Sequence, residues 1–164
     1  MTSTIYRSIS LGVLLLACWL ISGCANVPRA SIDDDRVAKS FPVPKEGKSS
    51  LYLVRNTTYG QPFRLELSIN GLPVALTAPQ TYVKYDLPPG RYFIGSRGEN
   101  YDQLPILLVE GRNHYVWQRT WIGWADMQTE LIELSEADGK AAVLESTMVK
   151  KLVEDKYLVP MATK

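Results

Sequence analysis

Arg64-Leu65-Glu66-Leu67-Ser68-Ile69-Asn70-Gly71-Leu72-Pro73-Val74-Ala75-Leu76 is the stretch of sequence that decides the fold. Asn70-Gly71 is the residue pair preferred in type I′ hairpin turns, because both residues tolerate positive φ. A two-residue turn sets six aliphatic side chains opposite one another on one face: Ile69 with Leu72, Leu67 with Val74, and Leu65 with Leu76. Turn chemistry and hydrophobic pattern therefore agree on an antiparallel hairpin. Because Pro73 lacks an N–H, we expect Leu72–Leu76 to be an edge strand or to end its pairing at Pro73.

The same alternation of polar and apolar residues continues on both sides of this hairpin and predicts about eight short strands in all. The other candidates are Leu51–Arg55, Thr81–Leu87, Arg91–Ser96, Leu104–Glu110, Asn113–Trp121 and Thr129–Leu134. We expect Leu104–Glu110 and Asn113–Trp121 to form a second hairpin around Gly111-Arg112. Short strands without helical crossovers are typical of an antiparallel sandwich or barrel, so the predicted fold is mainly β, a small antiparallel β-sandwich over residues 48–136.

The pattern changes period after the last strand. Ala141, Leu144, Met148 and Leu152 recur at helical spacing, which predicts a helix from about Ala141 to Asp155. Residues 137–164 are therefore expected to form a C-terminal helix and tail, with a frayed tail as the alternative.

The N-terminus has the layout of a secretory signal, with Arg7 before an apolar run over residues 11–21. This run is too short to span a bilayer, which takes about 20 apolar residues. Ile21-Ser22-Gly23-Cys24 has the form of a bacterial lipobox, so residues 1–23 are predicted to be a removed signal peptide and Cys24 to carry lipid. The alternatives are a short transmembrane anchor and a signal cut without lipidation. Ala25 stands where Gram-negative lipoproteins retained at the inner membrane tend to have aspartate. For a Gram-negative source we therefore expect an outer-membrane lipoprotein facing the periplasm.

Residues 24–47 are predicted to be the lipidated cysteine and a tether. Prolines punctuate this segment, and fully extended it would reach about 75 Å. Ser31, followed three residues later by Asp34, predicts one short capped helical turn. The acidic run from Asp33 to Asp35 lacks the glycine and distal glutamate of a calcium loop.

Composition excludes several classes of function. The chain has 18 lysine and arginine residues and 17 aspartate and glutamate residues, and removal of Arg7 with the signal peptide makes the two numbers equal. The mature chain therefore has no net charge, and it lacks the basic surface that nucleic-acid binding requires. Cys24 is the only mature cysteine, so no internal disulfide or cysteine metal site can form. The single histidine, His114, argues against a histidine metal site, and we expect no metal and no cofactor.

Several short motifs, in order, resemble the bacterial lipoproteins grouped as domain of unknown function 2846. They are Ala38-Lys39-Ser40-Phe41, Leu51-Tyr52-Leu53-Val54-Arg55, Leu87-Pro88-Pro89-Gly90-Arg91-Tyr92 and Val109-Glu110-Gly111-Arg112-Asn113-His114-Tyr115-Val116. The resemblance covers roughly residues 36–145. It implies a sandwich like those of PEGA and carboxypeptidase-regulatory-type modules, with no assigned activity and no catalytic residues to carry over.

The residues favour a binding module over an enzyme. A nucleophilic serine needs a positioned base, and His114 lies in a predicted strand. Large aromatic residues with arginine are the usual anchors of interfaces. The candidate binding surface is Trp121, Trp124 and Arg119. Arg97 and Tyr101 belong to a second patch, the polar loop Arg97–Gln103, for which a plain solvated connection is the alternative. Trp117 is expected in the core. We therefore expect a non-enzymatic, membrane-anchored binding or scaffold module with an envelope protein or polymer as partner. The alternatives are a small envelope-acting hydrolase and a structural subunit of an envelope complex.

Overall fold

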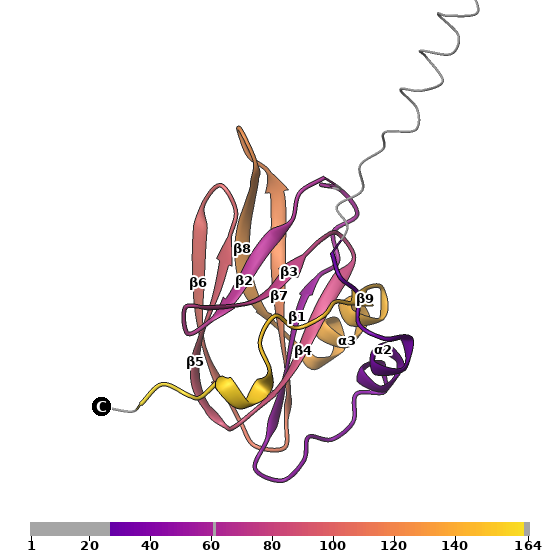
Figure 1. Cartoon of the computed structure of the whole chain (residues 1–164), viewed down its shortest axis with the longest axis vertical. Coiled ribbons are helices and arrows are strands. Elements are labelled where there is room, and N and C mark those ends of the chain that lie inside the picture. Colours follow the sequence, from indigo (N-terminus) through magenta and orange to yellow (C-terminus); the bar gives the residue numbers. More distant parts are fainter. Residues whose placement is uncertain (1–26, 61, 163–164) are drawn as a thin grey trace, which may run out of the picture.

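The structure of the chain is a computed structural model that describes residues 27–60 and 62–162. Within these residues nine strands form two sheets, and helices cover the outer face of one sheet (Figure 1). The prediction of a mainly β sandwich with a helix near the C-terminus is confirmed.

The larger sheet has the strand order β8-β7-β1-β4-β9. Its strands are β1 at Ser49–Arg55, β4 at Thr81–Leu87, β7 at Asn113–Ile122, β8 at Met127–Leu134 and β9 at Thr147–Met148. The smaller sheet, in the order β3-β2-β5-β6, contains β2 at Leu65–Ile69, β3 at Leu72–Thr77, β5 at Gly90–Arg97 and β6 at Tyr101–Leu108. The helices are α2 at Ile32–Lys39, α3 at Glu136–Leu144 and a 3₁₀ turn, η1, at Asp155–Tyr157. Because β7 runs parallel to β1 and β9 runs parallel to β4, the larger sheet is mixed, whereas the sequence predicted antiparallel pairing.

Strand β1 is buried along its whole length, and this produces three layers. Leu51 and Leu53 lie in the main core between the two sheets. Tyr52 and Val54 belong to a second cluster, which the larger sheet forms with residues of α2 and α3. The Tyr52 ring stacks on that of Tyr115 from β7, with 5.1 Å between centroids. Full burial of one large apolar side chain stabilises the fold by about 1.5–3 kcal/mol, so both faces contribute substantially.

The interior of the sandwich becomes polar toward the end where β7 leads into β8. The Gln118 side chain accepts a hydrogen bond from Thr77 Oγ1 at 2.6 Å and donates one to Ser96 Oγ at 2.7 Å. Ser96 Oγ in turn lies 2.6 Å from Thr129 Oγ1. Arg55 is fully buried at the same end, and this burial lowers the pKa of its guanidinium to about 10. The hydrogen-bonded chain thus satisfies the polar side chains from Thr77 to Thr129, whereas Nε and Nη2 of Arg55 are buried without a hydrogen-bond partner among the described residues.

The hairpin predicted around Asn70-Gly71 forms as β2 and β3. Both turn residues have positive φ, 51° and 81°, as a type I′ turn requires. Ile69 opposes Leu72 as predicted, but a bulge follows, so Leu67 opposes Ala75 and Leu65 opposes Thr77. The predicted register beyond the turn is therefore wrong, because Val74 is the extra residue of the bulge. The prediction that the strand after the turn lies at a sheet edge is confirmed.

The second predicted hairpin is wrong. Strand β6 pairs with β5 in the smaller sheet, whereas β7 pairs with β1 and β8 in the larger sheet. The turn at Gly111-Arg112 therefore crosses between the sheets, and the Gly111 N–H donates to the Lys48 carbonyl rather than across a hairpin. Alternation identifies strands but does not say which sheet each one joins.

The predicted helix from Ala141 to Asp155 is also wrong in its bounds. Helix α3 begins after Ser135, whose side chain accepts a hydrogen bond from Asp138 N, and it ends at Leu144. The chain then turns back, and β9 extends the larger sheet beside β4. Burial of Met148 and Val149 against the sheet outweighs the helical period of these residues.

The segment predicted as a tether packs on the sandwich from residue 27 onward. Val27 is buried in the main core, and Arg29 pairs with Val149. Ser31 caps α2 through Asp34 N, as predicted, although the helix runs for eight residues. Only the link between Cys24 and Val27 lies outside this packed segment, and three residues span at most about 10 Å.

Gly139 lies where α3 meets the sheet, and we expect Gly139→Ala to destabilise the fold. Alanine stabilises an ordinary helix interior by about 1 kcal/mol relative to glycine. Here an added Cβ would lie 2.2 Å from Tyr115 Cγ, a clash within a packed layer. Overpacking costs about 1–3 kcal/mol, so the free energy of unfolding in urea should fall. In the control, Ala141→Gly at an exposed position should cost only the propensity difference. A more stable Gly139→Ala variant would contradict this packing.

Candidate functional site

The aromatic residues predicted as a binding surface lie at the turn between β7 and β8. Trp124 is 96% exposed, Ile122 is 74% exposed and Trp121 is 37% exposed. The Arg119 guanidinium lies 5.9 Å from the centre of the Trp121 ring and forms an ion pair with Glu130. Trp121 and Trp124 are therefore surface residues, as the sequence predicted.

The second predicted patch lies on the opposite side of the sandwich. Arg97 follows the inward-facing Ser96 in β5, so its side chain leaves the outer face of the smaller sheet. There it lies 5.5 Å from the centre of the Tyr101 ring. Trp117 is half-buried on the outer face of the larger sheet, in a hollow lined by α3, so the prediction that it fills the sandwich core is wrong. The five candidate residues thus do not form one surface.

The polar loop between β5 and β6 holds the neighbouring strand β8. Asn100 exchanges two hydrogen bonds with the Thr129 backbone, each 2.8 Å long. Asp102 accepts a hydrogen bond from Leu131 N at 2.6 Å. Because β8 is an edge strand of the larger sheet, these side chains occupy backbone groups that would otherwise be unpaired.

His114 lies beside a hollow of about 240 Å³ between β7, β8 and the start of α3. Its Nε2 accepts a hydrogen bond from Val109 N at 3.0 Å, and its Nδ1 lies 3.9 Å from a carboxylate oxygen of Glu133. Burial lowers the pKa of His114, and this outweighs the opposing effect of Glu133. Since the Nε2 lone pair is already bonded to the backbone, the ring has no free acceptor to take a proton from a substrate.

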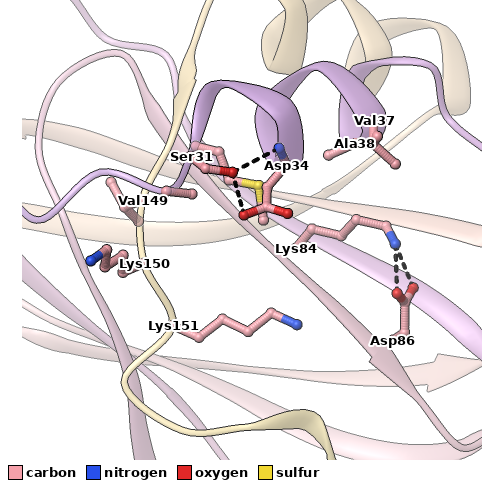
Figure 2. A pocket seen from close by; sticks show the side chains of 11 residues that line it. Ser31, Asp34, Val37, Ala38, Lys84, Asp86, Val149, Lys150 and Lys151 are labelled. Carbon is pink, nitrogen blue, oxygen red and sulfur yellow. Dashed lines mark hydrogen bonds and ion pairs between the residues drawn. The ribbon is translucent and has the colours of Figure 1, made fainter.

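A larger groove, of about 610 Å³, separates α2 from β4 and the segment after β9 (Figure 2). Lys84 and Asp86 come from β4, Lys150 and Lys151 from the segment after β9, and Asp34 from α2. Sequence analysis did not identify this groove, because its walls are three segments far apart in the chain. The only local signal is the spacing of Lys84 and Asp86, which places both on one face of a strand.

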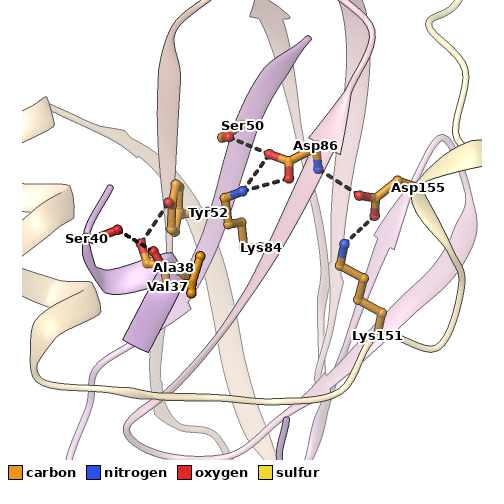
Figure 3. A network of polar contacts seen from close by, with 9 residues as sticks. All are labelled: Val37, Ala38, Ser40, Ser50, Tyr52, Lys84, Asp86, Lys151 and Asp155. Atoms are coloured by element: carbon orange, nitrogen blue, oxygen red, sulfur yellow. Dashed lines mark hydrogen bonds and ion pairs between the residues drawn. The ribbon is translucent and has the colours of Figure 1, made fainter. Parts of the chain in front are cut away.

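A polar network continues from the groove along β4 (Figure 3). Lys84 Nζ donates to both carboxylate oxygens of Asp86, at 2.6 and 2.7 Å, and Ser50 Oγ donates to the same carboxylate at 2.5 Å. Burial raises the pKa of Asp86, but the hydrogen bonds from Lys84 and Ser50 outweigh it and hold the pKa below its ordinary value. Asp155 accepts a hydrogen bond from Asp86 N at 3.1 Å and pairs with Lys151. The Lys84–Asp86 pair is thus fixed at the groove, and Lys151 is tied to η1.

The signal peptide predicted at residues 1–23 and the lipidated Cys24 lie outside the described residues. Within residues 27–60 and 62–162, no helix is long and apolar enough to cross a membrane. The same residues contain no cluster of three histidine, cysteine, aspartate or glutamate side chains suited to a metal ion.

We expect Asp86→Asn to destabilise the protein at neutral pH, by about 1 kcal/mol, because Lys84 is largely buried and loses its charged partner. A carboxylate whose pKa is lowered in the folded state stabilises the fold above its unfolded pKa, and this contribution disappears as the pH falls through the folded pKa. The difference between variant and wild type in urea unfolding should therefore shrink as the pH falls below the ordinary pKa of an aspartate. The exposed Asp33→Asn variant is the control and should change stability little at either pH. A difference for Asp86→Asn that persists in acid would contradict the ion pair.

Comparison with known proteins yields a relative that is described as an uncharacterized protein. The chain is 30% identical over 143 residues to an uncharacterized protein of Haemophilus influenzae, and the match covers 87% of this chain and 83% of the relative. No protein-family model matches the chain. No solved structure matches it. The extent and identity of the match show that the chain belongs to the same family as this Haemophilus influenzae protein.

Proposed function

We propose that the protein is a bacterial lipoprotein, anchored through lipid on Cys24, that acts as a non-enzymatic binding module of the cell envelope. The observation that carries this proposal is the tetrapeptide Ile21-Ser22-Gly23-Cys24 at the end of a short apolar run. For a Gram-negative source, Ala25 favours the periplasmic face of the outer membrane. The resemblance to domain of unknown function 2846 points the same way.

The packing of the N-terminal segment supports a role close to the membrane. Because residues 28–30 are hydrogen-bonded to the segment around Val149, the sandwich would hang from the lipid by the link from Cys24 to Val27. That link reaches at most about 10 Å, so the domain would stay at the membrane surface. Confinement of this kind raises the effective concentration of the domain, so weak contacts suffice for binding.

The groove between α2 and β4 is the site at which we propose that an envelope component binds. It has a volume of about 610 Å³, and convergent polar groups in such a hollow are typical of binding sites. Three lysines and two aspartates line it, and Lys150 makes no ion pair within the described residues. This balance favours a ligand with a carboxylate or phosphate group. The bonded lone pair of His114 favours binding over hydrolysis.

Palmitate labelling in bacterial cells tests the anchor. The wild-type chain should incorporate label and lose residues 1–23, and Cys24→Ser should do neither, because serine lacks the thiol that accepts the lipid. The matched control is Cys18→Ser, which should be labelled like the wild type, since residue 18 lies within the removed segment. Label that survives in Cys24→Ser would refute lipidation at this position.

Photocrosslinking in intact cells tests the groove. Benzoylphenylalanine at Val37, an exposed lining residue, should give an adduct with an envelope component, whereas the same group at the exposed Val43 outside the groove should not. Lys150→Glu should remove the adduct by repelling an anionic ligand. Lys156→Glu, a change at an exposed lysine outside the lining, should leave the adduct intact. Equal adducts from both positions would show that the groove is not the binding site.

A further inference from the structure

The hairpin tip formed by Trp121, Ile122 and Trp124 exposes apolar surface, and the charged groups nearby, Arg119 and Glu99, lie at its base. Thr120 to Ala125 contains no charged side chain, and the three large residues protrude where the β7–β8 hairpin projects from the molecule (Figure 1). Single exposed apolar residues are common on proteins, but a projecting group of large ones marks an interaction site. Tryptophan is suited to a membrane interface, because its ring is apolar while its N–H remains polar.

The backbone of the tip is held from within the protein. One carboxylate oxygen of Glu99 accepts hydrogen bonds from Ala125 N at 3.1 Å and Asp126 N at 3.2 Å, and these bonds lower the pKa of Glu99. Gly123 N donates to Asp126 O at 2.8 Å. These three N–H groups are bonded inside the protein and so lose no hydrogen bond to water when the tip enters a less polar medium. The tip therefore presents its side chains outward on a fixed support.

The tip also lies toward the end of the molecule that carries the anchor. Strand β7 is parallel to β1, so its last residue, Ile122, extends beyond the end of β1 at Arg55. Strands β4 and β9 both begin at this end, and Arg29 pairs with Val149, the residue that follows β9. In Figure 1, the segment that starts at residue 27 lies in the half of the molecule from which the β7–β8 hairpin projects. A link of at most about 10 Å from Cys24 would hold this half against the bilayer.

We propose that Trp121, Ile122 and Trp124 enter the interfacial region of the same bilayer that holds the lipid on Cys24, as a second membrane contact. The inference rests on the proposed lipid anchor. The anchor makes the second contact intramolecular, so three side chains suffice where they would not hold a free protein. With two attachment points the sandwich is held in one orientation at the bilayer.

Fluorescence quenching by brominated lipids tests the contact. The full, lipidated chain is reconstituted in vesicles of phosphatidylethanolamine and phosphatidylglycerol, with bromine on the acyl chains of part of the phosphatidylethanolamine. Tryptophan emission of the wild type should be quenched, and Trp121→Phe combined with Trp124→Phe should lose most of that quenching, because the pair removes both tryptophans of the tip. Phenylalanine keeps an aromatic ring at these two exposed positions, so the substitutions leave the fold intact. In the control, Tyr101→Trp added to this double variant places a tryptophan on the outer face of the smaller sheet and should not restore quenching.

Three results would overturn the inference. Equal quenching at positions 101 and 124 would show that the tip is not oriented toward the bilayer. Absence of quenching in a chain whose Cys24 carries palmitate would refute the membrane contact alone and leave the lipid anchor standing. Absence of palmitate would overturn both proposals.

Discussion

The whole architecture depends on the fact that strand β1 is buried on both faces. The run Leu51-Tyr52-Leu53-Val54 directs two aliphatic side chains into the sandwich and a tyrosine and a valine to the opposite side. The smaller sheet covers the first face, so the second face needs another cover. Helix α2, which precedes the sandwich in the chain, and α3, which follows it, supply this layer together. Burial of one strand thus brings both flanking segments onto the sheet.

The cover explains the position of the groove and the length of the link to the proposed anchor. Helix α2 is fixed by contacts such as the hydrogen bond from Tyr52 Oη to Ala38 O, 3.0 Å long. The groove is the space that remains between this helix, β4 and the segment after β9. The same segment is hydrogen-bonded to residues 28–30. Most of the segment that was predicted to be a long tether is therefore packed on the sandwich, and Cys24 lies only three residues before the folded part.

Local sequence patterns predicted most strands and the Asn70-Gly71 turn, because alternation and turn chemistry depend on neighbouring residues. They did not predict which strands pair. The turn at Gly111-Arg112 looks like a hairpin turn in sequence, yet it joins two sheets, since long-range pairing with β1 determines where β7 lies. Met148 fits a helical period but joins a sheet edge for the same reason. The exposed tryptophans were predicted because a tight turn cannot bury them, whereas the groove depends on contacts between distant segments and gave almost no signal.

The loop between β5 and β6 both covers the edge strand β8 and supports the exposed tip of the β7–β8 hairpin. Asn100 and Asp102 occupy backbone groups of β8, and Glu99 occupies those of the turn that follows β7. In the hairpin supported in this way, the N–H groups of Gly123, Ala125 and Asp126 are bonded within the protein. The loop that sequence analysis treated as a second binding patch is therefore better understood as the support of the first. Glu99, Asn100 and Asp102 thus stabilise the fold near the tip, and the aromatic residues of the tip remain exposed for contact.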